Sequence, residues 1–224
     1  MPIASVVGCK CKKKTANNFD RLKTKRNLYH MENKNDFETR IKTDTVLFFD
    51  LDGTLVNTDL ANFLSYKKAL QHVLNPEIEL SFNADVRLNR SSISSLVPDL
   101  TEKDLQEIIQ KKELFYEEFI HETQINKFVI DILARYSKTN TTVLVTNCRK
   151  DRALMTLKYH GLTDNFSRIF HRQINGGEAK INKYQNAIVN LNISTHTVVV
   201  FENEKSEIND ALIAGIPIQN IFSV

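Results

Sequence analysis

Three short apolar runs limit what this chain can fold into, because polar residues follow each of them. The runs cover residues 45–49, 142–145 and 197–201 and are rich in β-branched and aromatic side chains. Continuous apolar runs of this length are typical of strands that are buried on both faces, as in a parallel sheet. Ligands bind beyond the carboxyl ends of such strands, so the polar residues that follow are expected to meet at one site.

Helical patterns lie between these runs. Apolar side chains recur at helical spacing over residues 153–157, 181–191 and 208–212. Strands that alternate with helices predict an α/β fold with a doubly wound parallel sheet that is covered on both faces. Further short strands are expected at residues 168–170 and 218–222.

The segment between the first two strands departs from this alternation. Residues 59–137 contain three apolar stripes at helical spacing and no strand pattern. We therefore expect an α-helical cap domain over residues 59–137, inserted into a core made of residues 43–58 and 138–224. The cap should pack as a small bundle above the carboxyl edge of the sheet.

The net charge of +3 conceals an uneven distribution. Residues 1–42 carry 11 Lys and Arg against 4 Asp and Glu, a net charge of +7, while residues 43–224 carry 19 against 23, a net charge of −4. The basic leader lacks apolar periodicity, so a solvated, disordered tail is expected. Electrostatic contact between this leader and nucleic acid or an anionic surface is the less favoured alternative.

Cysteine content and hydropathy bear on the cellular compartment. Cys9, Cys11 and Cys148 are an odd number without the spacing of a disulfide framework, which favours a reducing compartment and predicts a cytoplasmic protein. No run approaches the roughly 18 apolar residues of a membrane span, so no membrane attachment is expected.

The polar segment after the first run carries the most specific motif. Asp50-Leu51-Asp52-Gly53-Thr54 follows an apolar strand, and carboxylates at positions i and i+2 of an extended segment point the same way. With this pattern the chain resembles the haloacid dehalogenase-like hydrolases, whose first motif is an apolar strand followed by Asp-x-Asp-Gly-Thr. The resemblance implies that Asp50 is the nucleophile, which forms an aspartyl-phosphate, and that Asp52 is the general acid and then the base.

Two later motifs of the family have counterparts in the same order. The second motif is an apolar strand that ends in Ser or Thr, and it corresponds to Thr146 followed by Asn147, which are implied to bind phosphoryl oxygens. The third motif is a lysine at the start of a helix, where Lys180 matches best and Lys183 is the alternative. A compact ammonium there would offset the charge of the nucleophile and of the phosphoryl group.

The fourth motif implies a Mg²⁺ site. Mg²⁺ prefers oxygen ligands and commonly bridges carboxylates to phosphate. By resemblance, the ion is held by the Asp50 carboxylate, the backbone carbonyl of Asp52, Glu202 and Asn203. Asn203 stands where the family commonly has Asp, so a weaker affinity for the metal is expected.

The position of the insert points to a branch of the family. It resembles the helical type-1 cap of the phosphoglycolate phosphatase and β-phosphoglucomutase-like branch, which implies a Mg²⁺-dependent phosphatase of a small phosphorylated metabolite. A phosphomutase is the nearest alternative. A weakly active or non-catalytic binding or regulatory module is the other, motivated by Asn203 and by the basic leader. Arg87, Arg90 and Arg149 are candidates to bind a second anionic group of the substrate.

Overall fold

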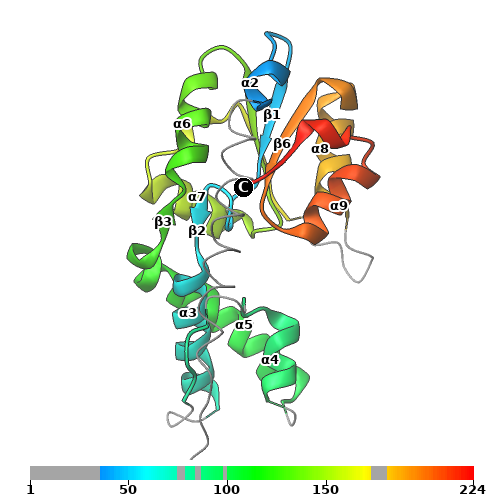
Figure 1. The fold of residues 1–224 in the computed structure, drawn as a ribbon. Coiled ribbons are helices and arrows are strands. Elements are labelled where there is room, and N and C mark those ends of the chain that lie inside the picture. Colours follow the sequence, from blue (N-terminus) through cyan, green and yellow to red (C-terminus); the bar gives the residue numbers. More distant parts are fainter. Residues whose placement is uncertain (1–35, 75–78, 84–86, 98–99, 173–180) are drawn as a thin grey trace, which may run out of the picture. The chain divides into compact units, whose positions relative to one another are not determined.

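The computed structural model describes residues 36–74, 79–83, 87–97, 100–172 and 181–224 (Figure 1). The chain divides into two units, residues 1–40 and 41–224, and the described part of the first is helix α2 (Asp36–Arg40). This helix lies within the segment for which the sequence predicts a disordered tail, and residues 1–35 lie outside the described residues. The sheet, the insert and the candidate site all belong to the second unit.

A five-stranded parallel sheet forms the centre of the second unit. Its order is β5-β4-β1-β6-β7, and each neighbouring pair is parallel. The strands are β1 (Val46–Phe49), β4 (Thr141–Val145), β5 (Arg168–Phe170), β6 (Val198–Glu202) and β7 (Ile221–Ser223). The predicted α/β fold with a parallel sheet is confirmed.

Helices cover both faces of this sheet (Figure 1). One face carries α8 (Lys183–Leu191) and α9 (Lys205–Ile213), and the other carries α6 (Lys127–Tyr136) and α7 (Lys150–Tyr159). Short 3₁₀ turns occur at η3 (Thr163–Asn165), η4 (Thr195–Thr197) and η5 (Ile218–Asn220). No helix among the described residues is long and apolar enough to cross a membrane.

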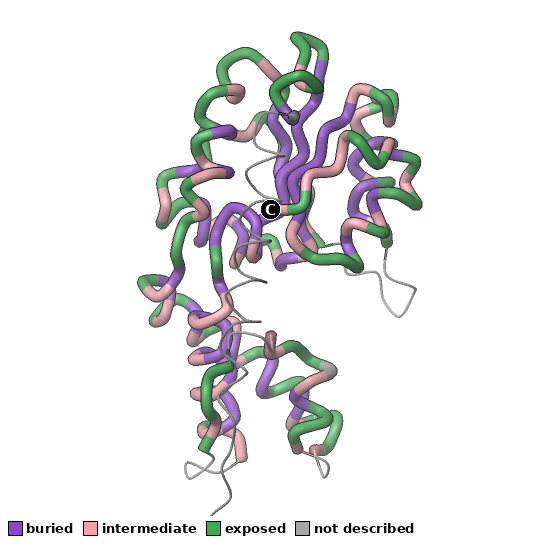
Figure 2. Tube along the Cα trace, viewed as in Figure 1, coloured by how far each residue is buried: buried purple, intermediate pink, exposed green. Residues whose placement is uncertain are grey.

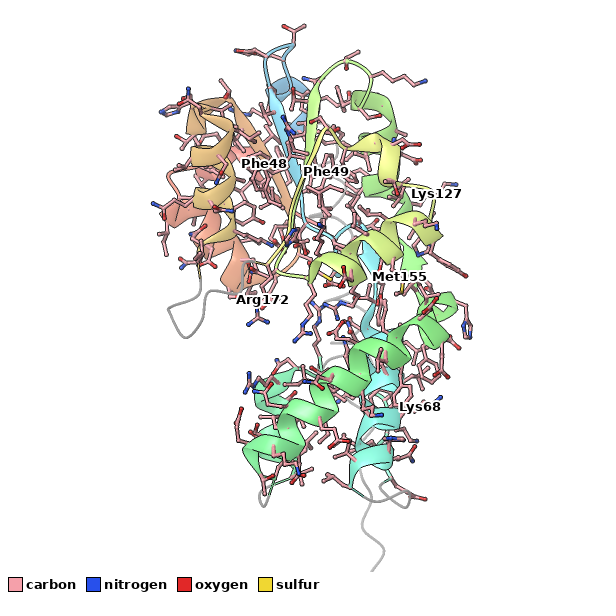
Figure 3. All side chains as sticks on the ribbon, turned by 180° about the vertical axis from the view of Figure 1, so that it is seen from behind. Phe48, Phe49, Lys68, Lys127, Met155 and Arg172 are labelled. Atoms are coloured by element: carbon pink, nitrogen blue, oxygen red, sulfur yellow. The ribbon has the colours of Figure 1, made fainter. Side chains whose placement is uncertain are left out.

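Side chains of β1 alternate between the two faces of the sheet (Figure 3). Phe48 stacks on Tyr184 of α8, with ring centroids 6.5 Å apart. Phe49 points to the other face, where it stacks on Phe201 at 4.9 Å and meets the edge of Phe166. The central strands are therefore buried from both sides, as Figure 2 shows and as their continuous apolar sequences predict.

The helices between β2 and β3 pack around a core of their own. They are α3 (Asp59–Val73), α4 (Arg90–Leu96), α5 (Glu102–Tyr116) and the 3₁₀ segment η2 (Glu117–Glu122). Their buried apolar core consists of Tyr66, Ala69, Leu70, Ile93, Leu105, Ile108 and Ile109. The inserted α-helical cap of the predicted fold class is therefore present.

A two-stranded ribbon marks where the chain enters and leaves this insert. β2 (Val56–Asn57) pairs antiparallel with β3 (Gln124–Ile125). The sequence predicts a cap over residues 59–137, but α6, which follows β3, packs beside β4 of the sheet. We therefore propose that the cap spans residues 58–123 and that α6 belongs to the core.

The burial of Phe48 generates a stability prediction. Its side chain is fully buried between the sheet and α8, so Phe48→Ala should lower the free energy of unfolding by about 3–5 kcal/mol. Urea denaturation followed by circular dichroism measures this change. Val189→Ala is the control, because Val189 is 70% exposed on α8 and its truncation should change the free energy by less than about 0.5 kcal/mol. Equal effects of the two substitutions would contradict the assigned packing.

Candidate active site

Three polar residues that are far apart in the sequence lie together at the carboxyl edge of the sheet. Asp50 follows β1, Thr146 follows β4 and Glu202 ends β6, and β1 is the neighbour of both other strands. Their exposed fractions are only 5%, 1% and 0%. All three line a cavity of about 830 Å³, together with side chains from the cap.

Lys183 is the first residue of α8 and reaches into this cluster of acids. The side chain of Asn182 caps the helix by accepting hydrogen bonds from the backbone N–H groups of Tyr184 and Gln185. Lys183 Nζ donates to Asp50 Oδ1 at 2.7 Å and to Glu202 Oε2 at 2.8 Å. Lys183 is the alternative that the sequence offers for this lysine, and the favoured candidate, Lys180, lies outside the described residues.

The pKa values of Lys183 and Asp50 reflect both burial and the charges of neighbouring residues. Burial lowers the pKa of Lys183. The negative charges of Asp50, Glu202 and Glu207 have a larger, opposite effect and hold this pKa above its ordinary value, so the ammonium stays charged. Burial raises the pKa of Asp50 to about 7, although Lys183 acts in the opposite direction. The negative charge of the Asp50 carboxylate is therefore only partly neutralised by its protein partners.

Glu202 is fully buried and accepts four hydrogen bonds. Its Oε1 accepts from the backbone N–H groups of Asn203 at 2.9 Å and Glu204 at 3.0 Å. Its Oε2 accepts from Lys183 and, at 2.6 Å, from the hydroxyl of Tyr184. Two carboxylate oxygens offer about four lone-pair sites, so these donors saturate the group. Glu202 is therefore arranged to orient Lys183, and its role as a metal ligand stays a prediction.

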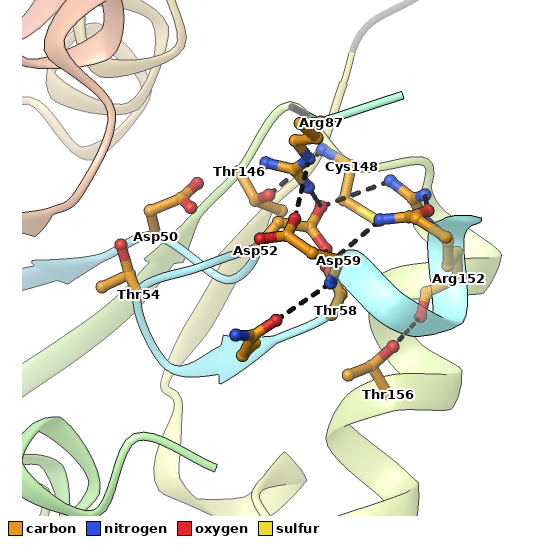
Figure 4. Close-up of polar contacts among 12 residues, drawn as sticks. Asp50, Asp52, Thr54, Thr58, Asp59, Arg87, Thr146, Cys148, Arg152 and Thr156 are labelled. Carbon is orange, nitrogen blue, oxygen red and sulfur yellow. Dashed lines mark hydrogen bonds and ion pairs between the residues drawn. The ribbon is translucent and has the colours of Figure 1, made fainter. Parts of the chain in front are cut away.

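Asp52 lies in a closed ring of hydrogen bonds with Thr58, Asn62 and Arg152 (Figure 4 shows most of these contacts). Thr58 Oγ1 donates to Asp52 Oδ1 at 2.6 Å, and Asn62 Nδ2 donates to Thr58 Oγ1 at 3.2 Å. Arg152 closes the ring by donating to Asn62 Oδ1 at 2.7 Å and to Asp52 Oδ2 at 3.2 Å. The ring joins the turn after β1, the first turns of α3 and the core helix α7.

The environment of Asp52 favours its ionised form. Arg87, from the loop before α4, adds an ion pair to Asp52 at 3.4 Å. Burial raises the pKa of Asp52, but Arg152, Arg87 and the Thr58 hydrogen bond together hold the pKa well below its ordinary value. The pKa values of the two aspartates of the motif are therefore shifted in opposite directions although the residues are only two positions apart.

The residues after β4 are held by local hydrogen bonds. Thr146 Oγ1 accepts from the backbone N–H of Cys148 at 3.1 Å, which leaves the hydroxyl proton to donate elsewhere. Asn147 Nδ2 donates to Glu207 Oε2 at 2.8 Å, so its side chain is held by α9. Burial raises the pKa of the Cys148 thiol to about 12, which keeps this cysteine protonated at neutral pH.

Other polar residues of the site carry no sequence motif. Arg152, Asn62 and Thr58 hold Asp52, and Tyr184 holds Glu202. Tyr184 directly follows Lys183, and Thr58 lies four residues after the end of the first motif, which is a weak signal. Arg152 and Asn62 are 90 residues apart and meet only because α7 approaches α3.

Comparison with known proteins assigns the chain to a family. Residues 47–221 match a family model described as haloacid dehalogenase-like hydrolase. A phosphorylated carbohydrates phosphatase from Thermotoga maritima is 26% identical over 185 residues, which cover 80% of this chain and 84% of that protein.

Two solved structures share the fold. A predicted phosphoglycolate phosphatase from Haemophilus somnus 129pt is 20% identical, with a TM-score of 0.63 and coverage of 78% of this chain and 84% of that one. The HAD-hydrolase YfnB from Bacillus subtilis, bound to magnesium, is 18% identical, with a TM-score of 0.57 and coverage of 78% and 85%. Because the family model spans most of the sequence, and the parallel sheet carries the cluster of acids and lysine at its carboxyl edge, the chain belongs to the haloacid dehalogenase-like hydrolases.

Proposed function

We propose that this hydrolase is a Mg²⁺-dependent phosphatase that acts on a small phosphorylated metabolite through an aspartyl-phosphate intermediate. The observation that carries the proposal is the position of Asp50, a buried carboxylate that faces the cavity and is held by Lys183 at 2.7 Å. A carboxylate in this position can act as a nucleophile, and covalent catalysis divides one difficult displacement into two easier ones. The phosphatase name of the Thermotoga maritima relative points to the same chemistry.

In the proposed first step, an Asp50 carboxylate oxygen attacks phosphorus and the bond from phosphorus to the leaving oxygen breaks. Asp52 donates a proton to that leaving oxygen. In the second step Asp52 accepts a proton from water, whose oxygen attacks the phosphorus and releases Asp50 and inorganic phosphate. General acid and base assistance of this kind contributes about 10²–10⁴-fold to the rate.

Asp52 has to change partners before it can act. In the ring it is an ionised carboxylate that faces Arg152 and Arg87, and an ionised carboxylate cannot donate a proton. We infer that Asp52 leaves these two guanidinium groups and gains a proton when a substrate occupies the cavity. Arg87 and Asn62 belong to the cap, so a movement of the cap could release Asp52.

The remaining site residues bind the phosphoryl group in this proposal. The Thr146 hydroxyl and the backbone N–H of Asn147 are suited to donate to phosphoryl oxygens at the carboxyl edge of β4. Lys183 offsets the charge that Asp50 and the transferring group bring together. Such donors act strongly in a site from which water is excluded.

The residues present fit a small oxygen-preferring cation. Asp50 is a buried carboxylate with Lys183 and the acid Glu202 beside it, and Asp52 and Asn203, which line the same cavity, could add the neutral oxygens of a backbone carbonyl and a side-chain amide. No group of three or more His, Cys, Asp or Glu among the described residues is arranged as a metal site, so the ion would depend on neutral ligands. When bound, Mg²⁺ would neutralise negative charge on the phosphoryl oxygens.

The cavity favours a substrate with a second anionic group. Arg149 precedes α7 and Arg172 follows β5, and both line the cavity, with Arg172 extending from the carboxyl edge of the sheet (Figure 3). No described carboxylate forms an ion pair with either of them, whereas Arg87 is engaged by Asp52 and Asp59. We propose that Arg149 and Arg172, rather than Arg87, bind that group.

Other functions of the same site make different predictions. A phosphomutase would return the phosphoryl group from Asp50 to a second hydroxyl of the substrate, and product analysis distinguishes it from a phosphatase. A non-catalytic module would bind phosphometabolites without turnover.

Cytoplasmic location stays a prediction, and nucleic-acid contact through the basic leader concerns residues that lie largely outside the described ones.

Asp50→Asn is the first test of this proposal. The substitution removes the nucleophile and keeps the size of the side chain, so Mg²⁺-dependent hydrolysis of p-nitrophenyl phosphate should fall by at least about 10³-fold. Circular dichroism should show an unchanged fold. Retention of substantial Mg²⁺-dependent turnover by a folded Asp50→Asn protein would exclude Asp50 as the nucleophile.

Paired lysine substitutions test which lysine serves the site. Lys183→Gln should lower kcat/KM for p-nitrophenyl phosphate by about 10²–10³-fold, because the charge beside Asp50 is lost. Lys180→Gln, the same chemical change three residues earlier, should have little effect. The reverse result would return the role to Lys180, and a melting curve for each protein excludes loss of the fold as the cause.

The second-anion proposal predicts selective effects of arginine substitutions. Arg149→Gln and Arg172→Gln should each lower kcat/KM for a sugar bisphosphate by about tenfold, because a charge-assisted hydrogen bond is lost. Their effect on p-nitrophenyl phosphate, which has no second anion, should be smaller. Arg168→Gln at the exposed start of β5 is the control and should leave both substrates unaffected. Equal losses for both substrates would contradict a second-anion role.

A further inference from the structure

The cap presents a fully buried lysine to the cavity. Lys112 lies on α5 with an exposed fraction of 2%, and it lines the cavity together with Tyr66, Ile109 and Glu113. Its Nζ lies 5.4 Å from the ring centroid of Tyr66 and 5.3 Å from that of Tyr116. The ammonium therefore lies beside two aromatic rings in the cap wall of the cavity.

Hydrogen bonds within the protein satisfy this ammonium only in part. Among the described residues, Lys112 Nζ has a single hydrogen-bond acceptor, Glu113 Oε1, at the long distance of 3.3 Å. Lys183, by comparison, has two carboxylate acceptors within 2.8 Å. An ammonium carries three N–H donors, so Lys112 has donors left for an oxygen of a bound molecule.

The burial of Lys112 is unfavourable for the protein alone. Burial and then the charge of Arg152 lower the pKa of Lys112 to about 8, although Glu113 acts in the opposite direction. At pH 7 the lysine is mostly charged in both the folded and the unfolded chain, so the full cost of burying the charge is present. A buried charge with one weak partner indicates a role in binding rather than in folding.

Lys112 and Glu113 offer a donor and an acceptor side by side. The ammonium can donate, and the Glu113 carboxylate, whose side chain is 23% exposed, can accept. A hydroxyl both donates and accepts at one oxygen, so it can bridge the pair. We propose that Lys112 and Glu113 form a cap subsite that binds a hydroxyl of the substrate's leaving group. The subsite rests on the proposed phosphatase function, which places the phosphoryl group at Asp50 in the same cavity.

The negative charge of Glu113 makes this subsite selective for a neutral group. The ion pair is close to neutral overall, and a carboxylate of the ligand placed there would be repelled by Glu113. Arg149 and Arg172 line the same cavity and form no ion pair with a described carboxylate. The two sets of residues thus divide the leaving group, whose anion faces the arginines and whose hydroxyl faces the cap.

Ligand binding to the Asp50→Asn protein tests the hydroxyl subsite without turnover. Titration calorimetry in MgCl₂ compares glycerol 3-phosphate with n-propyl phosphate, which has the same carbon chain and no hydroxyl. Adding Lys112→Met should weaken the binding of glycerol 3-phosphate by about tenfold, because a charge-assisted hydrogen bond is lost. The binding of n-propyl phosphate should change by less than about twofold. Lys111→Met, the same change at a neighbouring side chain that does not line the cavity, should alter neither.

Adding Glu113→Gln to the same protein tests the selectivity against an anion. 3-Phosphoglycerate has a carboxylate where glycerol 3-phosphate has its terminal hydroxymethyl group. Without the charge of Glu113, the binding of 3-phosphoglycerate relative to glycerol 3-phosphate should improve by about tenfold. Glu107→Gln at an exposed position of α5 is the control and should leave this ratio unchanged.

Thermal melting separates a binding role of Lys112 from a structural one. Lys112→Met should melt about 2–4 °C above its parent protein, because an apolar side chain of similar length replaces a buried charge. A lower melting temperature together with equal losses of affinity for the two phosphates would assign Lys112 to folding and overturn the proposal.

The remaining outcomes are equally decisive. Unchanged binding of glycerol 3-phosphate by Lys112→Met, or no detectable binding of this ligand by the Asp50→Asn protein, would overturn the hydroxyl subsite. An unchanged ratio in Glu113→Gln would overturn its selectivity. If the expected differences in binding are found but the wild type hydrolyses no phosphate ester, the proposed phosphatase function fails and the subsite stands.

Discussion

One buried lysine sets the charge balance on which the candidate site depends. Lys183 Nζ lies 2.7 Å from Asp50 and 2.8 Å from Glu202, with Glu207 at 3.4 Å. Buried charges are tolerated when they are paired and hydrogen-bonded, and here one ammonium faces three carboxylates. Burial, together with the charge of Glu202, raises the pKa of Asp50 although Lys183 lowers it. The excess negative charge of the cluster would stabilise a further cation. The sheet provides this cluster, because neighbouring strands end at the same edge.

The two aspartates of the motif lie only two residues apart, but their electrostatic environments are opposite. Asp50 is desolvated beside the lysine and two other acids, whereas Asp52 faces two guanidinium groups and a hydroxyl. Environments that push the pKa values of two acids apart are how one site assigns different roles to the same chemical group. The partners of Asp52 come from the cap as well as from α7, so the insert bears on the residue that is proposed to transfer the proton.

The sequence predicts the sheet well because local composition decides its strands. Continuous apolar runs can be satisfied only by burial on both faces, and the polar residues that end them must then converge. The end of the cap is harder to predict from the sequence. An apolar stripe such as that of α6 looks the same in the sequence whether the helix packs on a sheet or in a helical bundle. Lys183 reaches Asp50 because Asn182 caps α8 and places Lys183 at the first position of the helix, a boundary that the sequence pattern alone does not fix. The ring around Asp52 depends on tertiary contact between α3 and α7, which no motif encodes.

The most direct test of the central claim, that Asp50 carries the phosphoryl group, is mass spectrometry of the protein after a rapid acid quench during turnover of an aryl phosphate with Mg²⁺. A covalent phosphoryl group should appear on the peptide that contains Asp50 and should be absent from the Asp50→Asn protein. A phosphoryl group on another residue, or active turnover that never leaves a phosphoryl group on the protein, would contradict the mechanism.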